Sequence, residues 1–288
     1  MNKNVTTGLF QPIPQAIKNG LVMVIQILMI GSFACLLENI QFPFYQKFIH
    51  SFAGGTIYKI LAFVDSATLG MLSLYTAVSI STCYDKVLNG ENKAYSFPYV
   101  ATVLACFFIM IGFFESNIFD EFFNIRMFSG RGMFAALLAS IGGSVLFTFF
   151  CRIFKTKNSL YADGTDSVFN ATLESLIPAA CVITVFSLIN YVIILTTGCT
   201  CIQDLFVDAM NKIFDNMERS YFSGLLFIIL SQGMWFVGIH GSNLLEQVAA
   251  EKFMEINGSI VSKSFIDNFV IMGGCGTTLA LIIAVFLF

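Results

Sequence analysis

Seven long apolar stretches constrain this chain of 288 residues more than any other feature of its sequence. A helix needs about 20 mostly apolar residues to cross a bilayer, and its backbone groups must be paired within the protein. The stretches lack the strict alternation of a membrane β-barrel strand, so they predict helices. They span approximately residues 20–37, 60–83, 100–114, 133–150, 176–196, 222–239 and 269–288.

The composition also indicates a membrane protein. Hydrophobic residues make up 57% of the chain and charged residues only 11%, whereas a soluble domain carries about 25% charged residues. We therefore expect an all-α integral membrane protein: a polytopic bundle of about seven transmembrane helices, with room for re-entrant or interfacial helices. No basic patch with interleaved aromatic residues points to nucleic acid. The sequence also lacks G-x-S-x-G and H-E-x-x-H motifs and a spacing of cysteines that would hold zinc, so no catalytic residue, metal or cofactor is expected.

Two polar segments divide the chain. The turn-rich segment 158–166, "NSLYADGTD", predicts a boundary between an N-terminal half, 1–157, and a second half, 158–288. Segment 200–220 has apolar residues at three- and four-residue spacing, with Asp204, Asp208 and Lys212 on the other face. This pattern predicts an amphipathic helix on a membrane surface or in a protein groove.

A polar cluster, "WFVGIHGSN", ends the sixth apolar stretch. An ionisable residue at the membrane suggests a functional site, because placing it there costs free energy. Gly241 beside His240 permits close approach of a ligand, and Ser242 and Asn243 supply neutral donors and acceptors. With the ring of Trp235, these groups suit a sugar. The alternatives are a histidine at a helix end or interface and a tryptophan that anchors the protein at the membrane interface.

Two further clusters are candidates for binding. Gly273, Gly274, Gly276 and Thr277 open the last apolar stretch, which suggests either a broken helix that lines a cavity or tight helix packing. The second apolar stretch carries Asp65 and Thr68 among several hydroxyl residues. These side chains form either a polar helix site or hydrogen bonds between helices.

The motifs "MWFVGIHGSN" and, later, "FIDNFVIMGGCGTTLAL" resemble the membrane-embedded IIC component of the bacterial phosphoenolpyruvate-dependent sugar phosphotransferase system, in its lactose/cellobiose/diacetylchitobiose branch. "AIKNGLVMVIQILMIGSF" and "DSATLGMLSLYTAVSIS" are similar to the first two helices of that family. "SVFNATLESLIPAACVI" is similar to the segment entering its fifth helix. The resemblance therefore extends over nearly the whole chain.

The resemblance implies a homodimeric permease in the bacterial inner membrane. It would bind a β-linked disaccharide such as cellobiose or diacetylchitobiose and work with a IIB phosphocarrier that phosphorylates the sugar. The family's histidine at the sugar site corresponds to His240, with Asn243 as a further sugar contact. The half 1–157 would form the dimer interface, and the half 158–288 would carry the sugar site.

Two motifs of the family are missing from this sequence, and their absence changes what we expect the chain to do alone. The later Asn-Glu-Pro stretch, whose glutamate meets the sugar, does not occur in these 288 residues, and neither does a phosphocysteine motif. The chain is therefore expected to be C-terminally incomplete, to hold no phosphorylatable residue of its own and to give no phosphorylating uptake alone. The alternative function is a IIC-derived sensory module that binds a sugar or related ligand and signals to a regulatory domain.

The distribution of basic residues predicts a cytoplasmic N-terminus. This orientation places nine Lys and Arg residues on the inner side, including Lys86, Lys93 and Arg152, and six on the outer side. In a cysteine-depleted background, Asn89→Cys and Asn158→Cys should react with a membrane-impermeant maleimide only after the cells are permeabilised. Lys47→Cys, on the opposite side, should react in intact cells. Labelling of both test positions from outside would invert the orientation.

Overall fold

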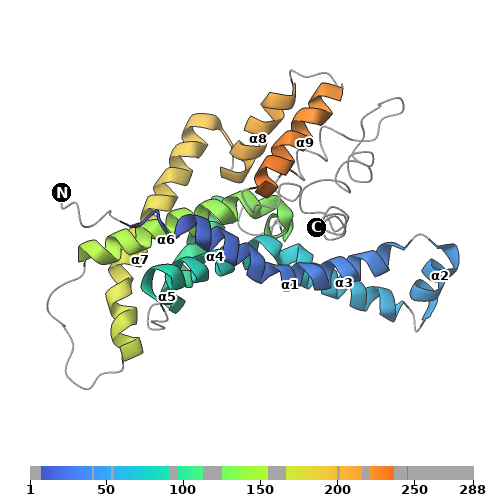
Figure 1. The fold of residues 1–288 in the computed structure, drawn as a ribbon, viewed down its shortest axis with the longest axis horizontal. Helices are drawn as coiled ribbons and strands as arrows, with labels where there is room; N and C mark the ends of the chain where they lie inside the picture. Colours follow the sequence, from blue (N-terminus) through green and yellow to red (C-terminus); the bar gives the residue numbers. More distant parts are fainter. Residues whose placement is uncertain are drawn as a thin grey trace, which may run out of the picture.

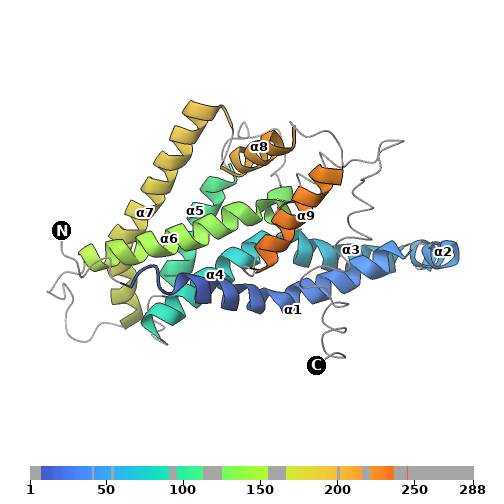
Figure 2. The same ribbon diagram turned by 45° about the horizontal axis from the view of Figure 1, so that its top comes forward.

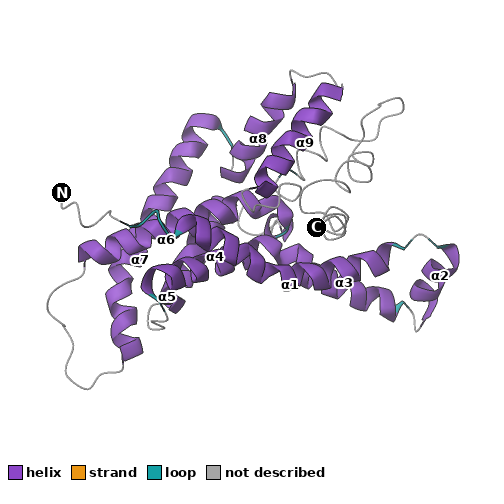
Figure 3. Cartoon of the chain, in the orientation of Figure 1, coloured by secondary structure: helices purple, strands orange, loops and turns teal. Residues whose placement is uncertain are grey.

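The computed structural model describes residues 8–40, 42–52, 55–90, 96–112, 125–154, 167–199, 202–215, 221–236 and 245. All regular structure in these ranges is helical, with no strand among them (Figure 3). The predicted all-α fold is confirmed. Four described helical spans are long and apolar enough to cross a membrane: Ile13–Asn39, Thr56–Leu88, Gly130–Phe154 and Thr172–Thr197. Two shorter apolar helices lie at Phe97–Met110 and Gly224–Gly233.

The first helix packs along a second span that is broken in its middle. Helix α1 (Ile13–Asn39) contacts both α3 (Thr56–Thr68) and α4 (Leu72–Asn89), which are joined by the 3-10 turn η2 (Leu69–Met71). The short helix α2 (Pro43–Ser51) lies at the tip of this pair, which extends away from the rest of the bundle (Figure 1). Helix α2 was not predicted, because nine residues give no transmembrane signal.

The predicted stretch 60–83 is therefore two helices and not one. Thr68 and Gly70 have low helix propensity and fall at the break. The Tyr75 hydroxyl donates a hydrogen bond to the Ala67 carbonyl at 3.0 Å. This bond gives a partner to a backbone acceptor next to the turn, where the regular helical ladder is interrupted.

Helix α6 (Met133–Phe154) lies at the centre of the described bundle. It follows the 3-10 turns η4 (Ile125–Phe128) and η5 (Gly130–Gly132) and packs against α4, α5 (Ser96–Met110) and α7 (Ser167–Thr197). Its buried face consists largely of small residues: Ala135, Ala136, Ala139, Ser140, Gly143 and Ser144. Small side chains let helices approach closely, which is how membrane helices associate when water exclusion no longer drives them together.

Buried tyrosines link α6 to its neighbours. The Tyr99 hydroxyl on α5 lies 2.8 Å from the Ser144 carbonyl and 2.7 Å from the Thr148 hydroxyl. Tyr84 on α4 donates to the carbonyl of Leu9 at 2.6 Å and fixes the chain just before α1. Each of these hydrogen bonds gives a partner to a tyrosine hydroxyl whose burial would otherwise cost free energy.

Helix α7 crosses the bundle, and α8 and α9 follow it along the chain (Figure 1). Helix α7 packs against α5 and α6 across the predicted boundary at residue 157, and it contains Pro178. Helix α8 (Ile202–Asp215) follows it and contacts α6, and α9 (Tyr221–Phe236) comes next along the chain (Figure 2). The predicted amphipathic helix is present as α8. The last predicted apolar stretch, 269–288, lies outside the described residues.

The contact between α1 and α4 depends on Gly20. A Cβ atom at this position would lie 2.7 Å from the Cα atom and 2.9 Å from the backbone nitrogen of Ile80, so the helices would have to separate. We expect Gly20→Ala to reduce the stability of the protein by about 1–3 kcal/mol, the usual cost of overpacking. Thermal unfolding in detergent would measure this loss.

Gly233 on α9 provides the matched control. It is also a helical glycine, but a Cβ atom there would meet nothing within 4 Å. Gly233→Ala should therefore leave the melting temperature unchanged or raise it slightly, because alanine favours helix. Equal melting temperatures for the two variants would contradict the role given to Gly20.

Candidate functional site

The structure describes only part of the predicted site. His240, Gly241, Ser242, Asn243, Gly273, Gly274, Gly276 and Thr277 lie outside the described residues. Trp235 belongs to the last turn of α9, but its side chain also lies outside them. Asp65 and Thr68 are described, and both lie on α3.

Thr68 bonds to its own helix. Its hydroxyl donates to the carbonyl of Val64 at 2.6 Å and lies 3.2 Å from that of Asp65. The side chain also faces Gly31 of α1, where an added Cβ atom would overlap both Thr68 and Leu69. These contacts place Thr68 in the packing between α1 and α3.

Asp65 lies at the same helix pair and has a different environment. Its Oδ1 atom is buried and has no hydrogen-bond partner among the described residues. Glu38, near the end of α1, is close enough for its charge to repel that of Asp65, and the Tyr58 hydroxyl bonds the Glu38 carboxylate. Glu38 and Tyr58 therefore lie at the α2 end of the α1–α3 pair, and Asp65 lies further along α3, three residues before that helix ends at Thr68.

Helix α9 has one buried and one exposed face. Gly224, Phe227 and Ser231 are buried. Phe222, Leu225 and Ile229 are each more than half exposed on the other side. The recurrence of buried positions at three- and four-residue spacing shows that a single face of the helix is covered.

Two neighbouring polar groups of α9 lack hydrogen-bond partners among the described residues. Ser231 is only 2% exposed, and its hydroxyl has no hydrogen-bond partner among the described residues. The neighbouring Gln232 buries its amide Oε1, also without a partner there. The sequence interpretation had treated this segment as a plain apolar run. Ser231 comes four residues after Phe227 on the buried face, whereas Gln232 comes three residues after Ile229 and lies towards the exposed face.

Most hydroxyls on the transmembrane helices behave differently. Ser140, Ser175, Thr184 and Ser187 each donate to a carbonyl three or four residues earlier, at 2.8–3.0 Å. This local pairing is the usual way to place a hydroxyl in an apolar helix. Ser231 departs from that pattern.

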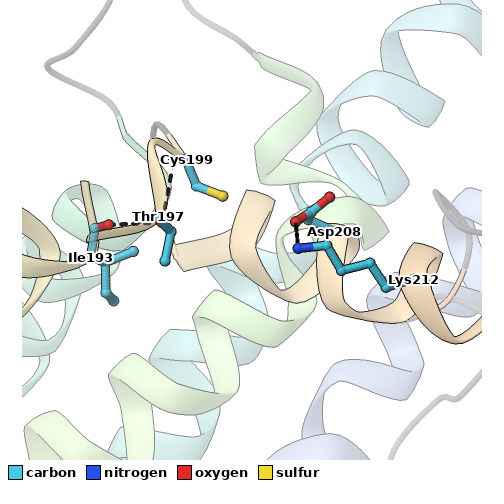
Figure 4. Close-up of polar contacts among 5 residues, drawn as sticks. All are labelled: Ile193, Thr197, Cys199, Asp208 and Lys212. Carbon is cyan, nitrogen blue, oxygen red and sulfur yellow. Dashed lines mark hydrogen bonds and ion pairs between the residues drawn. The ribbon is translucent and has the colours of Figure 1, made fainter. Parts of the chain in front are cut away.

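The junction between α7 and α8 is held by local contacts (Figure 4). Gly198 adopts a φ of 70°, the left-handed conformation that ends α7, and its amide bonds the Ile194 carbonyl. The Thr197 hydroxyl donates to Ile193 and accepts from the Cys199 amide. On α8, Asp208 lies 2.8 Å from Lys212, an exposed ion pair that raises the pKa of Lys212.

The apolar side of α8 attaches it to the bundle. Phe206 stacks on Phe134 of α6, with ring centroids 4.1 Å apart and an interplanar angle of 19°. The polar side remains exposed at Asp208 and Lys212. Among the described residues, no three His, Cys, Asp or Glu side chains gather where they could hold a metal ion.

A family model described as "Phosphotransferase system, EIIC" matches residues 18–288. Among curated proteins, the chain is 22% identical to the lichenan permease IIC component of Bacillus subtilis, over 95% of this chain and 64% of that protein. It is 21% identical to the cellobiose-specific EIIC component of Geobacillus stearothermophilus, over 93% of this chain and 63% of the relative. The chain thus spans less than two thirds of the length of these relatives.

A solved structure supports the fold. The crystal structure of the transporter ChbC, the IIC component of an N,N'-diacetylchitobiose-specific phosphotransferase system, superposes with a TM-score of 0.63 at 21% sequence identity. The match covers 96% of this chain and 68% of ChbC. At this level of identity, the match establishes a shared helical architecture.

The environment of Asp65 predicts that its charge destabilises the protein. Asp65→Asn keeps the shape of the side chain, removes repulsion from Glu38 and adds a donor, so it should raise the melting temperature at neutral pH. Asp208→Asn is the control, because an exposed ion pair contributes about 0–1 kcal/mol and its loss should change little. A lower melting temperature for Asp65→Asn would show that the carboxylate has a stabilising partner.

Proposed function

Because the chain belongs to the EIIC family of the phosphotransferase system, we propose that it binds a sugar within the membrane and carries it across as part of a permease. The observation that supports this function most strongly is the family match, which extends over residues 18–288. The described helices fit such a role, since several are long and apolar enough to span a bilayer. The matched relatives carry permease or EIIC in their names, which favours transport over the sensory alternative.

We propose that the sugar is a β-linked disaccharide. The relatives are named for cellobiose, lichenan and oligo-β-mannoside, and the structural neighbour for N,N'-diacetylchitobiose. Cellobiose and diacetylchitobiose share two pyranose rings joined by a β-linkage and differ at the 2-position. A site for such a ligand needs neutral hydrogen-bonding groups around an elongated ring pair and an aromatic surface for the C–H faces.

The segment from Trp235 to Asn243 supplies groups of this kind. The imidazole of His240, the hydroxyl of Ser242 and the amide of Asn243 can donate to and accept from sugar hydroxyls. Gly241 permits close approach, and Trp235 offers a ring for stacking. Gly273, Gly274, Gly276 and Thr277 would form a second wall of the same site, and Asp65 and Thr68 a separate polar helix site.

The two halves of the chain would have different roles. We propose that residues 1–157 form an interface half through which two copies pair, and that residues 158–288 contribute the sugar site. The many exposed apolar side chains of α1, such as Met29 and Phe33, each 65% exposed, suit contact with lipid or with a second copy. A IIB phosphocarrier would phosphorylate the sugar on the cytoplasmic side of the bacterial membrane, and the N-terminus would lie on the same side.

Substitution of His240 tests this proposal directly. His240→Ala should weaken binding of cellobiose or diacetylchitobiose by about 5- to 150-fold, which corresponds to roughly 1–3 kcal/mol for leaving buried partners unpaired. Isothermal titration calorimetry on protein in nanodiscs would measure the affinity. His50→Ala, which changes the only other histidine, provides the control and should bind as the wild type does. Wild-type affinity in His240→Ala would remove His240 from the site.

A further inference from the structure

We propose that the outer stripe of α1 is the surface through which two copies of this chain pair, with the amide of Gln26 at its centre. The outer stripe consists of six exposed positions at alternating three- and four-residue spacing: Asn19, Val22, Gln26, Met29, Phe33 and Leu36. This inference rests on the proposed pairing of two copies through residues 1–157. It deepens that proposal, because it names the helix and the side chains that meet.

The outer stripe lies opposite the face with which α1 packs inside one copy. On that inner face, Gly20 meets Ile80 of α4, and Gly31 meets Thr68 of α3. A helix turns by about 100° per residue, so the positions of the outer stripe fall on the other side of its cylinder. Phe33, for example, is 65% exposed. The described helices that pack on α1 therefore leave the outer stripe uncovered.

The amide of Gln26 distinguishes the outer stripe from a surface that only meets lipid. Gln26 is the middle residue of α1, and the apolar helix on either side is long enough to place it deep in the bilayer. Its oxygen needs a donor, but every N–H in the middle of a helix already bonds within the helix. Lipid tails offer no donor, and an unpaired polar group among them costs free energy. A donor from outside the helix would remove this cost.

A second copy of α1 supplies such a donor. A side-chain amide is self-complementary, because its NH₂ group donates and its oxygen accepts, so two Gln26 side chains related by a two-fold axis can satisfy each other. Two copies with the same membrane topology place their α1 helices parallel when that axis is normal to the membrane. Equal positions then meet at equal depth. Asn19, one heptad before Gln26, would meet its own counterpart in the same way.

The spacing of the outer stripe also fits a helix pair. Alternation of three and four residues is the pattern of the seam between two helices that cross at about 20°. From Asn19 to Leu36 the outer stripe is about 26 Å long at about 1.5 Å per residue, close to the bilayer's hydrocarbon thickness of about 30 Å. A polar residue at one position of such a seam fixes the register of the two helices. Gln26 would have that role, and the apolar residues of the outer stripe would pack on either side of it.

Cysteine cross-linking tests the geometry of the pair. Met29→Cys and Phe33→Cys, each in a cysteine-depleted full chain in lipid vesicles, should form disulfides under copper phenanthroline. Because each variant holds a single cysteine, any such disulfide joins two copies. Ile25→Cys and Ile30→Cys are the matched controls, since these positions are 42% and 54% exposed but flank the outer stripe, and they should cross-link much less. Equal cross-linking at all four positions would indicate random collision and overturn the assignment.

Substitution of Gln26 tests the contribution of the amide. Gln26→Leu removes the hydrogen bonds and keeps a side chain of similar size, so the dissociation constant of the pair in lipid should rise about 3- to 30-fold. Gln26→Asn keeps an amide and should recover part of this loss. Ser32→Ala removes another exposed polar side chain of α1 that lies off the outer stripe, and it should pair as the wild type does. Energy transfer between labelled copies over a series of protein-to-lipid ratios measures the constant.

The outcomes separate this inference from the proposed function. If the wild-type chain pairs but Gln26→Leu pairs equally well, or if the outer stripe gives no cross-link, another surface joins the two copies and this inference fails alone. If the wild-type chain stays monomeric at every protein-to-lipid ratio, the proposed pairing fails and this inference fails with it. The sugar site is decided separately in either case, by the calorimetry of His240→Ala.

Discussion

Close approach between helix backbones is the constraint on which the described structure depends. Small residues on α6 let α4, α5 and α7 pack around it, and Gly20 and Gly31 let α1 lie against α4 and α3. In lipid, apolar side chains gain little by moving from bilayer to protein, so the contact area and its fit must hold the helices together. The aromatic side chains of Tyr99, Phe107 and Phe147 then fill the space beside this small-residue face.

A second constraint concerns the hydrogen bonds of polar side chains within the helix bundle. Hydroxyls that serve only the fold bond to their own helix, as at Thr184 and Ser187, or tie one element to another, as at Tyr84 and Tyr99. Among the residues that the structure describes, the buried hydroxyls of Ser144 and Ser231 depart from this rule, since neither has a hydrogen-bond partner.

Hydropathy predicted most of the fold, because the length of an apolar run is a strong physical signal. The runs at 20–37, 133–150 and 176–196 correspond to α1, α6 and α7, each observed as somewhat longer. The break at Leu69–Met71 and the nine-residue α2 were missed, since both depend on local hydrogen bonds and turns that leave average hydropathy unchanged. The proposed site residues His240 and Asn243 rest on motif chemistry alone, and the unpaired hydroxyl of Ser231 could be recognised only from burial and hydrogen bonding.

The self-bonded hydroxyls have a consequence for how the protein enters the membrane during synthesis. A helix such as α7, whose Thr184, Ser187 and Thr196 already donate to its own carbonyls, can leave the translocation machinery without waiting for a neighbour. Ser73 is different, because its hydroxyl bonds the carbonyls of Met127 and Phe128, which are made more than fifty residues later. The partners that hold Ser73 in the folded protein therefore become available only when the segment before α6 has been made.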